Sequence, residues 1–169
     1  MTSRHRPSRR IWGERSTTTR PSARRFKGLA AGVHAESHLD ARLRELTILR
    51  LSAELGSDVE WGQHFKIATT AEVHGRVCLT VAEARAVRDG EPEGFPARGR
   101  AVMEYAAAFE KNPVDDEVWE RVSAQLTRVE ILDLTVLAGL YGMAGRLTNA
   151  LAVPMDEGIL PISAVDSLT

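Results

Sequence analysis

Glu45, Glu60 and His64 are three ionisable side chains whose spacing could bring them together for proton transfer. Glu60 and His64 are four residues apart, so on a helix they share one face. Glu45 has Ile48 and Leu49 on its own helical face, which predicts that its carboxylate points toward an apolar interior. Burial disfavours the charged form of a carboxylate, and an imidazole titrates near neutrality. Together the three groups could hold and move protons at neutral pH, as general acid–base catalysis requires.

Each of these residues also has a purely structural explanation. Ser57 and Glu60 have the spacing of a capping box, in which the glutamate would only close a helix end. Glu45 could pair with Arg42, three residues earlier, on a solvated surface. A single histidine such as His64 is more often satisfied or exposed than catalytic. Spacing alone leaves these alternatives open.

A metal site built from the same three side chains is a further alternative. Two carboxylates and one imidazole could hold Zn2+ or Fe2+. Because a Glu-x-x-x-His pair on a helix is common, we expect neither a metal nor any other cofactor.

A predicted helix hairpin positions the three side chains. The apolar period predicts a helix over residues 40–55, and Gly56 stands where a left-handed cap is needed. The next helix is expected from Ser57 to about residue 71. Because the connection at Gly56 and Ser57 is tight, we expect the two helices to form an antiparallel hairpin.

The rest of the chain predicts further helices, and the expected fold class is all-α. Thr80 and Thr127 each begin a run with capping-box spacing, and Pro113 separates two helices between them. Residues 90–97 are rich in Gly and Pro and are expected to form a loop. Helices are therefore expected over residues 80–90, 98–111, 116–125 and 127–152.

One segment departs from the helical pattern. Val73, Val77 and Leu79 alternate with polar residues, as in a short strand. A lone strand would have no partner in this chain, so we expect an extended loop.

The composition is that of a single domain with a hydrophobic core. The chain has 169 residues, of which 43% are hydrophobic. Its one cysteine, Cys78, excludes an intrachain disulfide and a dithiol redox pair. No apolar run approaches the roughly 18 residues that span a bilayer, so we expect no membrane partner and a cytoplasmic location.

The charge of the chain is divided between a basic head and an acidic body. Residues 1–27 carry a net charge of +8 and residues 28–169 a net charge of −9. The head shows no apolar period, so we expect residues 1–27 to form a disordered tail, 28–158 the helical domain and 159–169 a second tail. A transit peptide, a twin-arginine export signal and a nucleic-acid-binding arm are alternatives for the head. The acidic body opposes phosphate, so no nucleic-acid partner is expected.

Three runs of the sequence together resemble the carboxymuconolactone decarboxylase-like family, which shares a fold with alkylhydroperoxidase D. The resemblance extends over about residues 38–158. It implies a helical bundle around an antiparallel hairpin, assembled as a homo-oligomeric dimer, trimer or hexamer. The runs that carry it are RLRELTILR at 42–50, EWGQH at 60–64 and LAGLYGM at 137–143, continued by Arg146, Asn149 and Ala150.

The peroxidase branch of this family implies a different chemistry from the one expected here. That branch carries a C-x-x-C motif, a histidine four residues later and a glutamate on the preceding helix. Ser57 and Glu60 occupy the cysteine positions in this chain, while His64 and Glu45 match the other two. Without a thiolate there is no peroxidatic nucleophile, so we expect thiol peroxidase activity to be absent.

The decarboxylase branch implies a lyase of aromatic catabolism that works without a cofactor on a small carboxylated lactone or enol acid. We expect His64 and Glu60 to transfer the proton and Glu45 to orient His64 or act as a second acid. The alternative is a non-catalytic oligomer that keeps the fold as a binding or scaffold protein. Trp61, Tyr141 and Asn149 are expected to line the substrate pocket.

Two departures from the family pattern and one cluster of glycines remain. The stretch between His64 and Thr80 is a few residues longer than in relatives, and the helix that relatives carry before Asp40 is expected to be missing. The last long helix contains Gly139, Gly142 and Gly145, which predict a close approach by another helix, within the subunit or across an interface.

Overall fold

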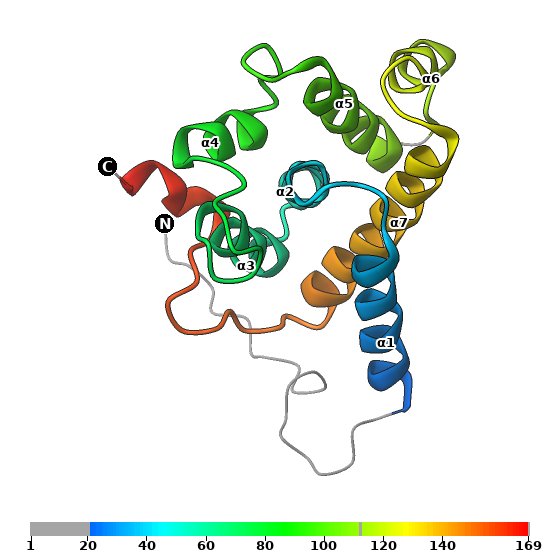
Figure 1. Cartoon of the computed structure of the whole chain (residues 1–169). Helices are drawn as coiled ribbons and strands as arrows, with labels where there is room; N and C mark the ends of the chain where they lie inside the picture. Colours follow the sequence, from blue (N-terminus) through cyan, green and yellow to red (C-terminus); the bar gives the residue numbers. More distant parts are fainter. Residues whose placement is uncertain (1–20, 112, 169) are drawn as a thin grey trace.

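The computed structural model describes residues 21–111 and 113–168, and all regular secondary structure in these residues is helical. The expected all-α class is thereby confirmed, and Figure 1 shows the arrangement. In chain order the elements are α1 (Pro21–Glu36), α2 (Ala41–Leu55), α3 (Asp58–Thr69), α4 (Val81–Asp89), α5 (Ala97–Lys111), α6 (Asp116–Ser123), α7 (Arg128–Ala150) and the 3-10 helix η1 (Ile162–Ser167).

Helix α2 is the centre of the bundle. Figure 1 shows it end-on, with α3, α4, α5 and α7 around it. Asp40 caps its first turn by accepting a hydrogen bond from Leu43 N, and Gly56 ends it with a φ of 58°. The helix is buried along most of its length, so any polar side chain that it carries must find a partner inside the protein.

The hairpin of α2 and α3 forms as predicted, but the predicted capping box at its turn is wrong. Ser57 precedes α3 with an extended backbone, and its side chain makes no capping hydrogen bond. Instead, the buried Ser57 hydroxyl lies 3.1 Å from the Thr148 hydroxyl on α7. The structural explanation for Glu60 is therefore removed.

Helix α1 corrects two expectations about the beginning of the chain. Residues 21–27 are helical, so this part of the head is not a disordered tail, and a helix does precede Asp40. Phe26, Ala30 and Val33 are spaced by four and three residues and pack against the core. The division of the chain by charge after residue 27 separates Phe26 from Ala30 and Val33. The apolar period of α1 is therefore not evident when the two parts are read separately. Residues 1–20 of the expected tail lie outside the described residues.

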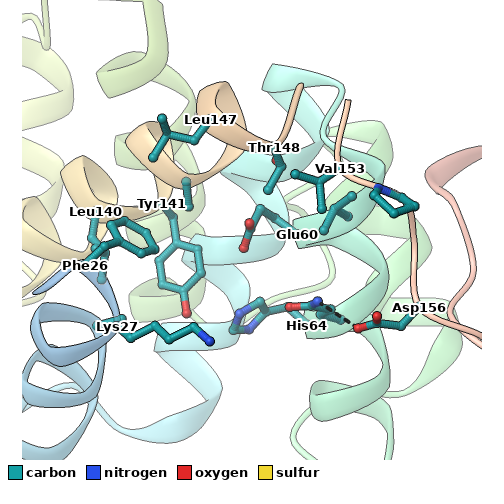
Figure 2. Close-up of a pocket in the computed structure, with 15 residues that line it drawn as sticks. Phe26, Lys27, Glu60, His64, Leu140, Tyr141, Leu147, Thr148, Val153 and Asp156 are labelled. Carbon is teal, nitrogen blue, oxygen red and sulfur yellow. Dashed lines mark hydrogen bonds between the residues drawn. The ribbon is translucent and has the colours of Figure 1, made fainter. Parts of the chain in front are cut away.

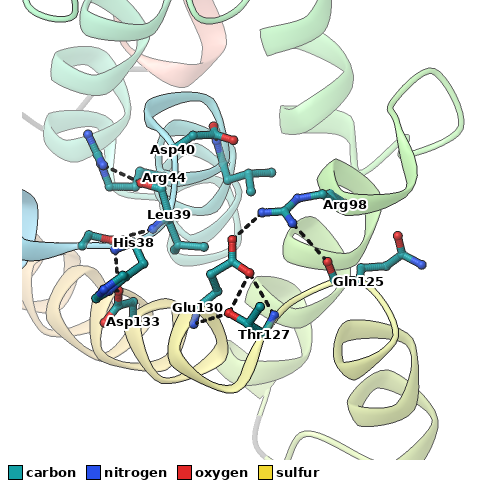
Figure 3. A network of polar contacts seen from close by, with 11 residues as sticks. His38, Leu39, Asp40, Arg44, Arg98, Gln125, Thr127, Glu130 and Asp133 are labelled. Carbon is teal, nitrogen blue, oxygen red and sulfur yellow. Dashed lines mark hydrogen bonds and ion pairs between the residues drawn. The ribbon is translucent and has the colours of Figure 1, made fainter.

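The capping boxes predicted at the start of two later helices are confirmed. Thr80 and Thr127 both form complete capping boxes, and Asp115 caps α6. At the start of α7, Glu130 accepts hydrogen bonds from Thr127 N and from Arg98 of α5, as Figure 3 shows. These bonds hold the pKa of Glu130 at about 2, well below the usual carboxyl range.

The segment between α3 and α4 is irregular, as expected. The amides of Cys78 and Leu79 both donate to Ala68 O, at 2.8 and 2.9 Å, which draws the segment back over the end of α3. Gly75 turns the chain with a φ of 67°. The segment is therefore anchored at its end rather than free in solvent.

Two other interior contacts are made by small residues. A Cβ at Gly145 would lie 2.8 Å from Leu55 Cδ1 and 3.3 Å from Ser57 Cβ, so here the close approach expected for the glycines of α7 occurs within the subunit. Gly62 of α3 lies against the C-terminal segment, where a Cβ would be 2.6 Å from Leu160 O. The expected C-terminal tail is thus packed on the domain and includes η1.

One face of α7 carries exposed apolar side chains: Val129, Leu132, Val136 and Met143. The expected homo-oligomer stays a prediction. Within residues 21–111 and 113–168, no helix is both long enough and apolar enough to cross a bilayer.

Replacing Gly62 by alanine tests the docking of the C-terminal segment. The new methyl group would lie 2.3 Å from Ile159 Cγ2 and against a backbone oxygen, so Gly62→Ala should cost about 1–3 kcal/mol in the free energy of unfolding. Gly28→Ala is the matched control, because a Cβ at Gly28 in α1 meets nothing within 4 Å. This control should be neutral or stabilising by up to about 1 kcal/mol. Equal urea midpoints for the two variants would contradict the described packing.

Candidate active site

A cavity of about 460 Å3 lies between α1, α3, α7 and the segment after α7. Figure 2 shows Glu60 and His64 of α3 facing Tyr141 of α7 across it, with Lys27 of α1 beside them. The other lining residues are mostly apolar: Phe26, Ala30, Val59, Gln63, Leu140, Ala144, Leu147, Thr148, Val153, Pro154 and Asp156.

His64 and Glu45 form the closest polar contact of the site. His64 Nδ1 lies 2.8 Å from Glu45 Oε2, and the two side chains are nearly fully buried. Glu45 does not line the cavity, whereas His64 does. If His64 donates its Nδ1–H to the carboxylate, its Nε2 carries the lone pair that can accept a proton. Among the described residues, Nε2 has no hydrogen-bond partner.

Glu45 is held by a second histidine. His74 Nε2 lies 3.0 Å from Glu45 Oε1, so each carboxylate oxygen is bound by one imidazole. Burial alone would raise the pKa of Glu45, but the hydrogen bonds and charges of His64 and His74 outweigh it and lower that pKa. The alternative pairing with Arg42 is wrong, because Arg42 binds Glu83 at 2.5 Å.

Glu60 lies in the opposite situation. It lines the cavity, and no described residue donates a hydrogen bond to its carboxylate. Burial raises the pKa of Glu60, and the nearby His64 only partly opposes this effect. The two glutamates therefore differ in their preferred protonation state, which favours Glu60 as an acid and Glu45 as a carboxylate.

Tyr141 joins the site to α1. Its hydroxyl lies 2.7 Å from His34 Nε2, and its ring stands edge-on to His64 with the centroids 4.8 Å apart. Burial, and then the charges of Glu45 and Glu60, raise the pKa of Tyr141, so the phenol keeps its proton. Burial also lowers the pKa of His34, whose ring is nearly parallel to that of His64 at 6.3 Å.

Two of the residues expected to bind substrate lie away from the cavity. Trp61 is fully buried in the core on another face of α3, where its ring stacks with Phe65. Asn149 is exposed and donates to Leu55 O at the end of α2. Their positions do not fit a role in substrate binding, whereas Tyr141 lines the cavity.

Three site residues were missed by the sequence reasoning. His34 and Lys27 lie on α1, which the division of the chain by charge concealed. His74 lies in the irregular segment before α4, where no period indicates which side chain turns inward. The sequence signal that could have drawn attention to His74 was its position between His64 and Thr80, a stretch that is longer than in relatives.

The metal-site alternative concerns Glu45, Glu60 and His64. Within the described ranges, no group of three or more His, Cys, Asp and Glu side chains is arranged to hold a metal ion. Both oxygens of Glu45 are already bound by imidazoles.

A model of the carboxymuconolactone decarboxylase family matches residues 21–101. Over these residues, which make up just under half of the chain, the protein is similar to the carboxymuconolactone decarboxylase family. The matched segment begins at the first residue of α1 and contains Glu45, Glu60 and His64. No protein with a curated description matches the chain significantly in sequence.

Solved structures share the alkylhydroperoxidase D-like fold with this chain. ATU0492 from Agrobacterium tumefaciens, a protein of unknown function described as a candidate antioxidant defence protein AhpD, superposes with a TM-score of 0.75. It is 18% identical over 89% of this chain and 99% of its own. The debrominase Bmp8 superposes with a TM-score of 0.70 at 16% identity over 87% of this chain and 76% of its own. A cysteine-to-alanine variant of Bmp8 in complex with 2,3,4-tribromopyrrole gives the same TM-score and identity over 86% and 74% of the two chains.

The opposite pKa shifts of the two glutamates predict opposite effects of their glutamine variants. The raised pKa of Glu60 means that stability falls as the pH rises from the ordinary carboxyl pKa of about 4.3 through the folded-state pKa. Glu60→Gln should therefore match the wild type at about pH 4 and be more stable at about pH 7.5. Urea unfolding at several pH values measures this difference, with the exposed Glu120→Gln as control. A stability difference independent of pH would contradict the half-buried Glu60 that no described residue binds.

Glu45→Gln should have the reverse effect. Because the pKa of Glu45 is lowered, its carboxylate stabilises the fold above about pH 4.3, and this stabilisation is lost as the pH falls through the folded-state pKa. An amide leaves one imidazole without its acceptor, so the variant should lose about 1–3 kcal/mol near pH 7 and a smaller amount in acid. Unfolding free energies that are equal to those of the wild type at neutral pH would be inconsistent with the double hydrogen bond.

Proposed function

We propose that this protein is a cofactor-free acid–base lyase that decarboxylates, or moves a proton on, a small carboxylated lactone or enol acid. The observation that carries the proposal is the His64–Glu45 contact behind a cavity that Glu60 also faces. The contact fixes one ring nitrogen of His64 and leaves the other free to exchange a proton with a bound molecule.

The reaction balances with the groups in the cavity. The bond between the carboxylate carbon and its neighbour breaks, and its electron pair moves into the adjacent carbonyl as an enolate while CO2 leaves. The enolate carbon then takes a proton from Glu60, which the raised pKa keeps available as an acid. Glu60 regains a proton from solvent by way of His64, and Glu45 holds His64 in the required orientation throughout.

The cavity suits a small, flat, carboxylated molecule. Its walls are mainly apolar, and among the described residues that line it Lys27 is the one Lys or Arg side chain. We assign to Lys27 the carboxylate of the substrate. Bmp8, which has the same fold, binds 2,3,4-tribromopyrrole as a variant, and this supports the proposal that such folds accept a small ring.

Cys78 does not support a thiol mechanism. It is buried, it does not line the cavity, and burial followed by the charge of Glu45 raises the pKa of its thiol. A thiol with a raised pKa forms little thiolate, which is the nucleophile in peroxidase chemistry.

The test of the proposal is CO2 release from a set of β-keto acids and carboxylated enol lactones. At least one compound should be turned over by the wild type, and His64→Gln should lose at least about 100-fold in kcat, because general acid–base catalysis contributes about that much. Circular dichroism establishes that the variant is folded. Turnover that is unchanged in folded His64→Gln would overturn the assignment. Binding without turnover across the set would favour the non-catalytic alternative.

Lys27→Gln tests the assignment of the substrate carboxylate. The variant should raise KM about fivefold while kcat changes little, since a surface-exposed charge contributes about 1 kcal/mol to binding. Lys111→Gln is the matched control, because this exposed lysine lies at the end of α5 away from the cavity. A KM that Lys27→Gln leaves unchanged would place the carboxylate elsewhere.

A further inference from the structure

His74, in the irregular segment between α3 and α4, has a polar side chain that turns inward and hydrogen-bonds to the site. Its side chain is 13% exposed, whereas Val73 beside it is 62% exposed. The segment therefore turns an imidazole inward and an apolar side chain outward, which is the reverse of the usual preference. An interior partner is needed to explain this orientation, and Glu45 Oε1 is that partner.

The His74 contact supplies a hydrogen-bond donor to the second oxygen of the Glu45 carboxylate. Glu45 is 1% exposed, so water does not solvate its oxygens. Oε2 accepts from His64, and among the described residues only His74 reaches Oε1. Without His74, the carboxylate would carry one unsatisfied buried oxygen and could rotate about its terminal torsion, which is soft in glutamate.

We propose that His74 is a positioning residue that fixes the tautomer of His64 through Glu45. By holding Oε1, it keeps Oε2 directed at His64 Nδ1, so that the proton stays on Nδ1 and the lone pair on Nε2 faces the cavity. The benefit to catalysis rests on the proposed function, but the effect on the tautomer does not.

The backbone around His74 is built to hold it in place. The double acceptance by Ala68 O fixes the end of the segment, and the left-handed turn at Gly75 directly follows His74. In metal sites, loss of the outer partner that orients a ligand typically costs 10- to 100-fold in affinity or activity, and His74 has the same geometric relation to His64 through Glu45.

The experiment measures the ring nitrogens of His64 directly. Long-range 15N–1H NMR spectra of the full chain without substrate distinguish the two neutral tautomers of each histidine. The wild type should show His64 with the proton on Nδ1. His74→Leu should lose this single state and show both tautomers, whereas His74→Gln, which retains a donor, should restore it.

Two further variants keep the test decisive. His74→Asn keeps a polar side chain that is too short to reach Glu45, so it should also show both tautomers of His64. It replaces His74→Leu in the test if the leucine variant does not fold. His38→Gln is the matched control, because this histidine is exposed and pairs with Asp133 away from the cavity. It should leave the His64 signals unchanged.

The possible results separate the two proposals. A His64 tautomer that is unchanged in folded His74→Leu or His74→Asn overturns the positioning role, whatever the activity. If the tautomer changes but no compound is turned over by the wild type, the positioning role stands and the proposed lyase function fails. If turnover exists, His74→Asn should lower kcat by about tenfold or more, and His74→Gln should recover most of it.

Discussion

The buried carboxylate of Glu45 is the constraint on which this site depends. A charge placed on the central helix cannot be solvated, so the protein must supply hydrogen-bond donors from other elements. It supplies two imidazoles, His64 from α3 and His74 from the segment that follows α3. The tight hairpin and the anchored segment therefore supply the hydrogen-bond donors that the Glu45 carboxylate on α2 needs. In meeting this need, they also orient His64, whose imidazole lines the cavity.

The same bundle places two chemically equal carboxyl groups in unlike surroundings. Glu45 has two donors and a lowered pKa, while Glu60 has none among the described residues and a raised pKa. Environments that separate pKa values in this way assign acid and base roles without a cofactor. Helix α1 completes the cavity, since Lys27 and Phe26 form one wall and His34 binds Tyr141 on α7. The exposed basic residues at the start of α1 thus belong to a helix that forms part of the site.

The sequence predicted those parts of the molecule that local spacing controls. Capping boxes at Thr80 and Thr127 and the face shared by Glu60 and His64 follow from distances of three or four residues, and the hairpin brings Glu45 to them. The errors concern contacts between distant segments. Ser57 has the spacing of a cap, but a hydroxyl on α7 competes for it. His34 and His74 meet partners 107 and 29 residues away, which no local pattern reports. Trp61 has the aromatic side chain that is common in ligand pockets, yet its face of α3 packs into the core.

The central claim is that the cavity transfers protons to and from carbon, and solvent-deuterium incorporation measures this transfer directly. The full chain is incubated in D2O with carboxylated enol lactones and β-keto acids, and proton NMR follows the carbon next to the carboxyl group. The account predicts that deuterium appears at this carbon with the wild type and that a folded variant lacking the His64 imidazole loses this exchange. Exchange at the same rate with and without the imidazole, or exchange at no compound in the set, would contradict it.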